Sequence, residues 1–280
     1  MTTDAAPLFG STDLAQRIER VETQMITAAT EAARLRAVAS TFVIPVAGGA
    51  ACYAEDGSPL NKVVGLGFGG VPGGDTLDEI ERAFAARGTP TQVELSNLAD
   101  PAIGAALTGR GYQLVSFENV LGRSLDGELQ RVAPAGVEVR LSNDRAAWLD
   151  VVVDGFAHPD DEGVPSHEEF PREVVEKVIG DIERAGATPY LAFCGGVVAG
   201  GGSMRVSDGV AQLTGAATAP AHRRRGVQTA LLSARLIDAA RAGCDIAVVI
   251  TQPGSKSPQN VQRRGFQLLY TRAVLVKPPS

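Results

Sequence analysis

The amino-acid sequence predicts a mixed α/β (α+β) fold of two similar tandem domains, each with a mixed, mostly antiparallel sheet flanked by helices. Helix-like and strand-like patterns alternate along the 280 residues, which is typical of such folds. The order of these patterns in the first half recurs in the second half about 154 residues later. We therefore expect one domain over residues 1–130 and a second over residues 131–280.

The composition and charge of the chain limit the kinds of function that it could have. The chain has 44% hydrophobic and 21% charged residues, as globular proteins do, and no apolar run approaches the roughly 18 residues of a membrane span. The N-terminus lacks the basic start and apolar core of a signal peptide, and the three cysteines lie far apart, without metal-site spacing. We expect a cytoplasmic protein with free thiols, no metal and no membrane partner. The net charge of −6 argues against nucleic acid as a partner.

The first half begins with a long amphipathic helix, expected over residues 12–36 with Ser11 or Thr12 as its N-cap. Apolar runs separated by turn glycines then predict strands over residues 40–46, 50–54 and 62–68. After the following glycines we expect a helix over 75–87, a strand over 91–95, a short helix over 100–108 and a long strand ending near Leu121.

The second half is expected to begin with a strand over residues 137–141 and a helix over 143–156 capped by Ser142 or Asn143. A second helix is expected over 167–185, with a break near Pro171. The patterns that follow predict an antiparallel meander over 189–194, 197–205 and 210–217, a helix over 227–241, a strand over 244–250, a short helix over 257–263 and a final strand region over 266–276.

The two halves share one order of elements. Both run helix, glycine, strand, polar loop, short helix and strand, and the segment Arg264-Gly265-Phe266 aligns with Arg110-Gly111-Tyr112. One supersecondary unit used twice indicates two domains related by a pseudo-twofold axis. A chance similarity is the alternative, since this order of elements is common.

The segment over residues 218–241 combines the features of an anion site. Pro220 ends the preceding strand, and Gly226 allows a tight turn into the helix. The first amides of a helix lack intrahelical partners and lie at the positive end of its dipole, where Arg223, Arg224 and Arg225 also lie. These features suit a phosphate or pyrophosphate. A solvated arginine loop is the alternative, because neither a Walker loop nor a dinucleotide glycine fingerprint is present.

The wider string resembles the acyl-CoA-binding motif of the GNAT N-acyltransferase superfamily, R/Q-x-x-G-x-G/A. Arg223 and Gly226 match this motif, whereas Gln228 stands where the family has Gly or Ala. Residues 254–266, with an asparagine-containing helix before Gly-Phe, resemble a later segment of the family. The resemblance covers residues 137–276 and extends to residues 14–121 as a degenerate copy, so it implies a tandem GNAT arrangement. In the first copy, Asp75 would repel a pyrophosphate, which implies a non-catalytic domain.

The resemblance also implies acetyl-CoA as co-substrate and indicates where it would bind. In the family the third and fourth central strands separate and pantetheine pairs with the fourth, which here covers residues 212–218 with Gly215 as a bulge. An amide of Ala216 or Ala217 would polarise the thioester carbonyl. The expected CoA-binding residues are Ala216, Ala217, Thr218, Arg223, Arg224, Arg225, Gly226, Val227, Gln228, Thr229 and Asn260, although Asn260 could equally be an exposed helix residue.

Candidate catalytic side chains are fewer. Four residues before the Gly-Phe pair, where many family members have a tyrosine acid, this chain has Val261. Tyr270 is the candidate acid, with strand packing as its alternative, and Ser257 is a hydroxyl that either approaches the thiol or caps the helix. An acidic loop expected to meet the acceptor contains His158 and His167 as candidate bases. A solvated acidic loop is the alternative.

These observations predict an acetyl-CoA-dependent N-acetyltransferase that transfers the acyl group to a small amine by direct attack in a ternary complex. No Cys/His or Ser/His arrangement suggests an acyl-enzyme. The alternatives are a non-catalytic acyl-CoA-binding sensor or interaction module, and an acyltransferase for an alcohol or a longer acyl chain. The first half would shape the substrate pocket or an oligomer interface, such as that of a homodimer.

Overall fold

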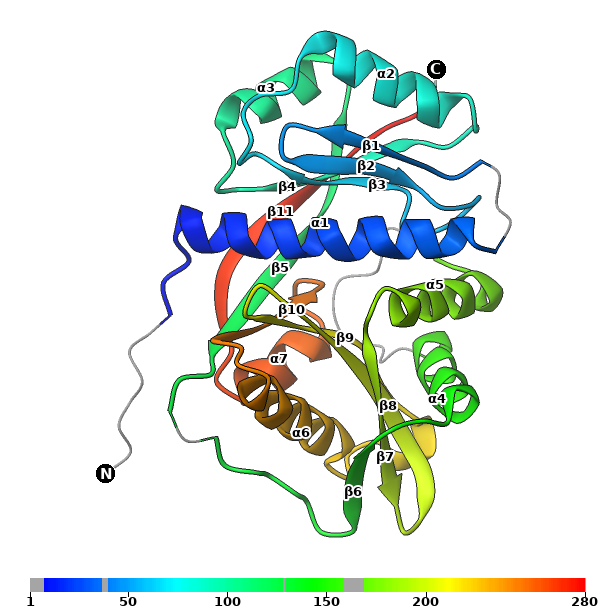
Figure 1. Cartoon of the computed structure of the whole chain (residues 1–280), viewed down its shortest axis with the longest axis vertical. Helices are drawn as coiled ribbons and strands as arrows, with labels where there is room; N and C mark the ends of the chain where they lie inside the picture. The colour runs from blue at the N-terminus through cyan, green and yellow to red at the C-terminus, as the bar shows by residue number, and fades with distance from the viewer. Residues whose placement is uncertain (1–7, 37–39, 128, 159–168, 280) are drawn as a thin grey trace.

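The computed structural model describes residues 8–36, 40–127, 129–158 and 169–279. The described residues form one 11-stranded sheet with helices on both faces (Figure 1). Within these ranges no helix combines the length and apolarity needed to cross a membrane.

The first half contains the elements that its sequence patterns predict. A helix of 23 residues, α1 (Thr12–Arg34), begins at Ser11, whose side chain accepts a hydrogen bond from the Leu14 amide. The elements that follow are β1 (Phe42–Val46), β2 (Gly49–Tyr53), β3 (Lys62–Leu66), α2 (Gly74–Ala85), β4 (Thr91–Ser96), α3 (Pro101–Gly109) and β5 (Gln113–Ser124).

The second half runs β6 (Val137–Leu141), α4 (Arg145–Ala157), α5 (Arg172–Arg184), β7 (Thr188–Cys194), β8 (Val197–Ser207), β9 (Val210–Thr218), a 3-10 turn η1 (Pro220–His222), α6 (Val227–Arg241), β10 (Ile246–Thr251), α7 (Lys256–Gln262) and β11 (Gln267–Lys277). The predicted cap of α4 was wrong: Asp144, not Ser142 or Asn143, accepts the amide of Ala147. A carboxylate at this end also favours the helix dipole. Pro171 lies at the N-terminus of α5 instead of breaking it.

The two halves join in one continuous sheet because two strands are exchanged between them. The strand order is β1-β2-β3-β4-β11-β5-β10-β9-β8-β7-β6. The last strand, β11, lies between β4 and β5 of the first half, while β5 lies between β11 and β10 of the second half. The antiparallel pair β5–β11 therefore lies at the centre of the molecule (Figure 1). In the register of this pair, Glu118 lies opposite Arg272.

Helices cover the sheet on two faces. One face, which we call the α1 face, packs against α1, α4 and α5, and its strand residues include Val64, Val210 and Val248. Their neighbours along the strands point to the opposite face, which we call the α6 face, where α2, α3, α6 and α7 pack. Helix α1 lies between the two halves in Figure 1 and contacts α5 of the second half.

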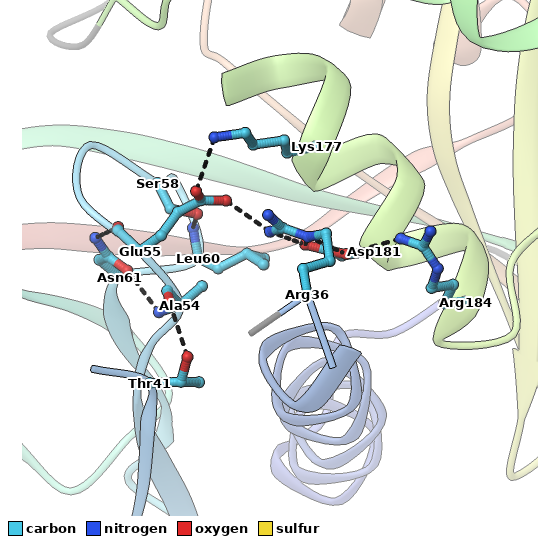
Figure 2. A network of polar contacts seen from close by, with 10 residues as sticks. All are labelled: Arg36, Thr41, Ala54, Glu55, Ser58, Leu60, Asn61, Lys177, Asp181 and Arg184. Carbon is cyan, nitrogen blue, oxygen red and sulfur yellow. Dashed lines mark hydrogen bonds and ion pairs between the residues drawn. The ribbon is translucent and has the colours of Figure 1, made fainter. Parts of the chain in front are cut away.

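A polar network fixes the end of α1 to the second half (Figure 2). Arg36 binds Asp181 of α5 through two nitrogens, Nε to Oδ1 at 3.0 Å and Nη2 to Oδ2 at 2.6 Å. The same Nη2 lies 2.6 Å from Glu55, whose other oxygen accepts from Lys177 of α5 at 3.0 Å. Burial alone would raise the pKa of Glu55, but Arg36 and Lys177 lower it below its usual value. The network therefore joins α1, the β2–β3 loop and α5.

Candidate functional site

The site begins with a bulge in β9. Gly201 of β8 pairs with Ala217 and Ser203 pairs with Thr214, so Gly215 and Ala216 lie opposite the single residue Gly202. Gly215 has a φ of 55°, a left-handed conformation that suits glycine. The predicted bulge at Gly215 is thus confirmed.

Next to this bulge, β9 and β10 separate. The two strands are parallel, and their pairing runs from Val210 opposite Ile246 to Gln212 opposite Val248. No further pair joins the remaining residues of these two fully described strands; we call this separation the fork. The expected separation of β9 from the strand before it was wrong, because β8 pairs with β9 as far as Thr218. The opening lies on the other edge of the same strand.

Beyond the fork, the chain turns into α6 through the predicted anion loop. The first helical hydrogen bond runs from the Ala230 amide to the Gly226 carbonyl, so the amides of Val227, Gln228 and Thr229 precede the helical ladder. Gly226 has a φ of 81°, and a Cβ there would lie 2.6 Å from Cγ of Pro134. Glycine is therefore required at this turn for both its backbone conformation and its small size.

The three arginines of the loop differ in their surroundings. Arg223 is half-buried, and its guanidinium donates to the main-chain carbonyl of His158 at the end of α4. This bond ties the loop to the segment that follows α4. Arg224 and Arg225 are exposed at the N-terminus of α6, and Arg224 has a left-handed φ of 62°. The loop can thus present two cationic side chains and several amides to an anion.

Comparison with known families agrees with this geometry. The family model described as "Acetyltransferase (GNAT) family" matches residues 156–266, from the end of α4 to the start of β11. Most of the second half of the chain thus matches the model of a GNAT domain. Acyl transfer is therefore the general class of chemistry that this domain supports.

Solved structures show that the whole chain has the tandem GNAT fold. A GCN5-related N-acetyltransferase from Kribbella flavida aligns with a TM-score of 0.63 at 22% identity, over 90% of this chain and 96% of its own. A tandem GNAT protein from the clavulanic acid biosynthesis pathway, solved without acetyl-CoA, aligns with a TM-score of 0.61 at 15% identity, over 98% of both chains. A GCN5-related N-acetyltransferase from Sphaerobacter thermophilus gives 0.55 at 17% identity, over 73% and 67%. No curated protein matches the sequence.

The first half of the chain has a related bulge but no fork. Val63 pairs with Val93 and Leu66 pairs with Leu95, so β3 and β4 remain paired on both sides of the irregularity. Helix α1 packs closely on it, because a Cβ at Gly65 would lie 2.1 Å from the Thr23 hydroxyl. Asp75 is exposed in the first turn of α2, where an anion would otherwise bind. These features favour CoA binding in the second half.

The predicted polar residues near the GNAT loop lie in several places. His158 follows α4 directly, and its Nδ1 lies 2.9 Å from the Asp154 carbonyl. Ser257 and Asn260 are exposed on α7, on the α6 face. His167 and the rest of the predicted substrate loop, residues 159–168, lie outside the described residues. Two shallow hollows lie along the β6–β7 edge, and neither includes a predicted CoA-binding residue.

Tyr270 is not brought to the fork. It lies on β11, separated from β10 by β5, and its side chain is buried on the α1 face. Its hydroxyl donates to Oε1 of Glu19 at 2.7 Å. Burial and the charge of Glu19 hold the pKa of this phenol well above its usual value. A firmly bonded, weakly acidic hydroxyl in this position favours the packing alternative.

Sequence reasoning missed a buried ionic network beneath α1. Its members are Glu19 and Glu22 of α1, Lys62 of β3, Glu94 of β4, Glu118 of β5 and Arg272 of β11. Arg272 Nε lies 2.7 Å from Glu19 Oε1, and Lys62 Nζ lies 2.6 Å from Glu94 Oε1. The sequence did contain a signal for this network, namely charged residues within otherwise apolar strand patterns. Charged side chains are seldom buried in a strand unless they have a partner.

Proposed function

We propose that the protein is an acetyl-CoA-dependent N-acetyltransferase that acts on a small amine by direct transfer in a ternary complex. The observation that carries this proposal is the fork between β9 and β10, which leads directly into the amide-rich N-terminus of α6. The GNAT domain supports acyl transfer in general, and the geometry of these elements supports CoA as the acyl carrier. The amine acceptor and the ternary mechanism belong to the proposal.

Each part of acetyl-CoA has a complementary part of the chain. The pyrophosphate would bind the amides of Val227, Gln228 and Thr229, with Arg224 and Arg225 beside it. The pantetheine arm would pair with the edge of β9 that faces the fork, next to Ala216, Ala217 and Thr218. Arg223 would support the loop through its bond to His158. Asn260 on α7 would contact the CoA arm on the α6 face.

The bulge would serve the chemical step. Attack of an uncharged amine nitrogen on the thioester carbonyl forms the C–N bond, breaks the C–S bond and releases the CoA thiolate. An amide of Ala216 or Ala217 would donate to the developing oxyanion. The proton lost by the nitrogen neutralises the thiolate, directly or through solvent. Ser257 on α7 would supply a hydroxyl near the CoA arm, and no described residue takes the place of the tyrosine acid at Val261.

Replacing Gly226 tests the binding part. Acetyl-CoA should bind the wild-type chain with one equivalent in isothermal titration calorimetry. Gly226→Val should weaken binding by about 100-fold or more, because the side chain meets Pro134 and strains a left-handed turn. Gly243→Val is the matched control, since Gly243 follows the other end of α6 with a φ of 80° and open space around it. Equal binding by the two variants would contradict the proposed site.

A non-catalytic acyl-CoA-binding protein is the second candidate. Val261 at the position of the family tyrosine and the buried bond of Tyr270 favour it. The two candidates differ in product formation, so release of the free CoA thiol in the presence of primary amines separates them. Acetyl-CoA binding without thiol release from any amine would support the binding protein over the enzyme.

A further inference from the structure

The central strand β5 passes the end of β10 at the fork. Thr251, the last residue of β10, pairs with Asn119, so Glu118 is the first residue of β5 beyond β10. Counting along the parallel pair from Val248 opposite Gln212 places Thr251 level with Gly215. By the same count, the residue after Thr251 would be level with Ala216 on one side and with Glu118 of β5 on the other. A residue from the first half thus lies across the fork from the bulge of the GNAT domain.

The side chain of Glu118 points to the α1 face. Its Oε2 lies 3.5 Å from Nη1 of Arg272, which binds Glu19 of α1. The α6 N-terminus and α7 pack on the opposite face of the sheet. An acyl group held from the α6 face and a nucleophile received on the α1 face would therefore meet at the fork from opposite sides. Direct transfer requires the nucleophile and the thioester carbon to be held close together in a suitable orientation.

Glu118 is the partly exposed carboxylate of the buried network. Its side chain is 28% exposed, whereas those of Glu19 and Glu94 are 2% exposed. Glu22 is also buried and accepts a hydrogen bond from Gln212 at 2.8 Å. The other carboxylates thus have short contacts inside the protein, while Glu118 has a longer contact and access to solvent.

The charges around Glu118 favour proton uptake near neutral pH. The groups that face it are Arg272 of β11, Glu94 of β4, Lys62 of β3, and Glu19 and Glu22 of α1. Together with Glu118, this group contains four carboxylates and two cations. Burial, followed by the charge of Glu94, raises the pKa of Glu118 to about 7, although Lys62 and Arg272 oppose this. A base that titrates near the working pH is well matched to removing a proton from an amine.

The position that corresponds to Glu118 in the repeat expected from the sequence, 154 residues later, is Arg272. Arg272 lies directly opposite Glu118 in the β5–β11 register. Its guanidinium is 1% exposed and bound to Glu19, with Glu94 at 3.5 Å. The two corresponding positions therefore differ: β11 has a buried, paired cation, whereas β5 has a partly exposed carboxylate.

We propose that Glu118 is the general base for the acceptor and that the acceptor is a primary amine that arrives as an ammonium ion on the α1 face. This inference rests on the proposed function. The ammonium gives one proton to the Glu118 carboxylate, and the freed nitrogen lone pair attacks the thioester carbon. As the C–N bond forms and the C–S bond breaks, the second nitrogen proton passes to the departing thiolate, directly or through water. Glu118 then releases its proton to solvent, which balances the reaction as amide, CoA thiol and one proton.

The test uses the full chain, acetyl-CoA and a panel of primary alkyl amines and polyamines, with release of CoA thiol as the readout. Glu118→Gln should bind acetyl-CoA with the wild-type Kd and lower kcat/KM at pH 7 by about 100-fold or more. The wild-type pH profile should have an inflection near pH 7 that Glu118→Gln lacks, and Glu118→Asp should restore part of the rate together with an inflection. A merely structural role would lower the rate without removing the inflection.

Glu138→Gln is the matched control, because Glu138 is an exposed strand carboxylate on β6 paired with Arg140 at 2.6 Å. It should leave both the rate and the inflection unchanged. A Glu118→Gln protein with the wild-type rate and profile would overturn the role of Glu118 and leave the proposed function intact. A wild-type chain that binds acetyl-CoA but acetylates no amine would overturn both, and one that binds no acetyl-CoA would contradict the proposed site itself.

Discussion

Buried carboxylates in this protein have two contrasting environments. Asp181 is fully buried, but Arg36 and Arg184 both donate to it, so its charge is compensated within the protein. Glu118 belongs to a network with an excess of carboxylates, and burial, followed by the charge of Glu94, raises its pKa to about 7. The first arrangement joins two halves of a fold, whereas the second makes ionisation unfavourable. Such unfavourable ionisation is common where a protein needs a reactive group.

The cost of ionising Glu118 should be visible in protein stability. A carboxyl whose pKa is higher in the folded than in the unfolded state binds more protons when folded, so stability falls as pH rises from about 4.5 to 7. Glu118→Gln removes this loss. Relative to wild type, the variant should gain up to about 3 kcal/mol of unfolding free energy between pH 4.5 and 8.

Urea denaturation at several pH values measures this gain without any acceptor. Glu138→Gln is again the control, and because Arg140 lowers the pKa of Glu138, this variant should not gain stability on going to high pH. If the unfolding free energies of wild type and Glu118→Gln depend on pH in the same way, then the pKa of Glu118 is the same in the folded and unfolded states, which would contradict the prediction.

At the scale of elements, local sequence patterns predicted boundaries well but could not identify strand partners. The bounds of α6 and β6 match the prediction residue for residue, and a glycine directly precedes each element, Gly226 before α6 and Gly136 before β6. The side on which β9 opens depends on β10, which lies about 30 residues later in the chain. The role of Glu118 depends on an exchange between halves, so no local pattern around it identifies its position at the fork.

The bulge of β9 makes its own prediction. Gly215 and Gly195 have φ values of 55° and 58°, so an alanine at either position should cost about 1 kcal/mol of stability through left-handed strain. Only Gly215→Ala should also weaken acetyl-CoA binding, because its Cβ would lie 3.1 Å from Oγ of Ser203 and disturb the strand edge at the fork. Gly195 has open space around it. Thermal unfolding and calorimetry on both variants separate strain from binding, and equal affinities would contradict a role for the bulge.

At the scale of the whole molecule, the exchange of β5 and β11 makes each half depend on the other. Without β11, β4 and β5 lose their shared neighbour, and without β5, β10 and β11 lose theirs. The buried network also needs α1, β3, β4, β5 and β11 together. The first half, which resembles a CoA site only weakly, therefore supplies β5, one of the two central strands, and the proposed base.

Separate fragments test this dependence. Residues 1–130 and 131–280 expressed alone should lack a cooperative thermal transition, because each fragment leaves strand edges and apolar surface without partners. Mixed or coexpressed, the fragments should form a 1:1 complex with a cooperative transition and restored acetyl-CoA binding. The 131–280 fragment is the decisive sample, since it contains the whole anion loop, α6 and the fork strands. If it unfolds cooperatively and binds acetyl-CoA alone, then the exchange is dispensable, and Glu118 cannot be essential for forming the CoA site. If it gains binding only when residues 1–130 are added, then the first half is a structural part of the GNAT site despite having no fork of its own.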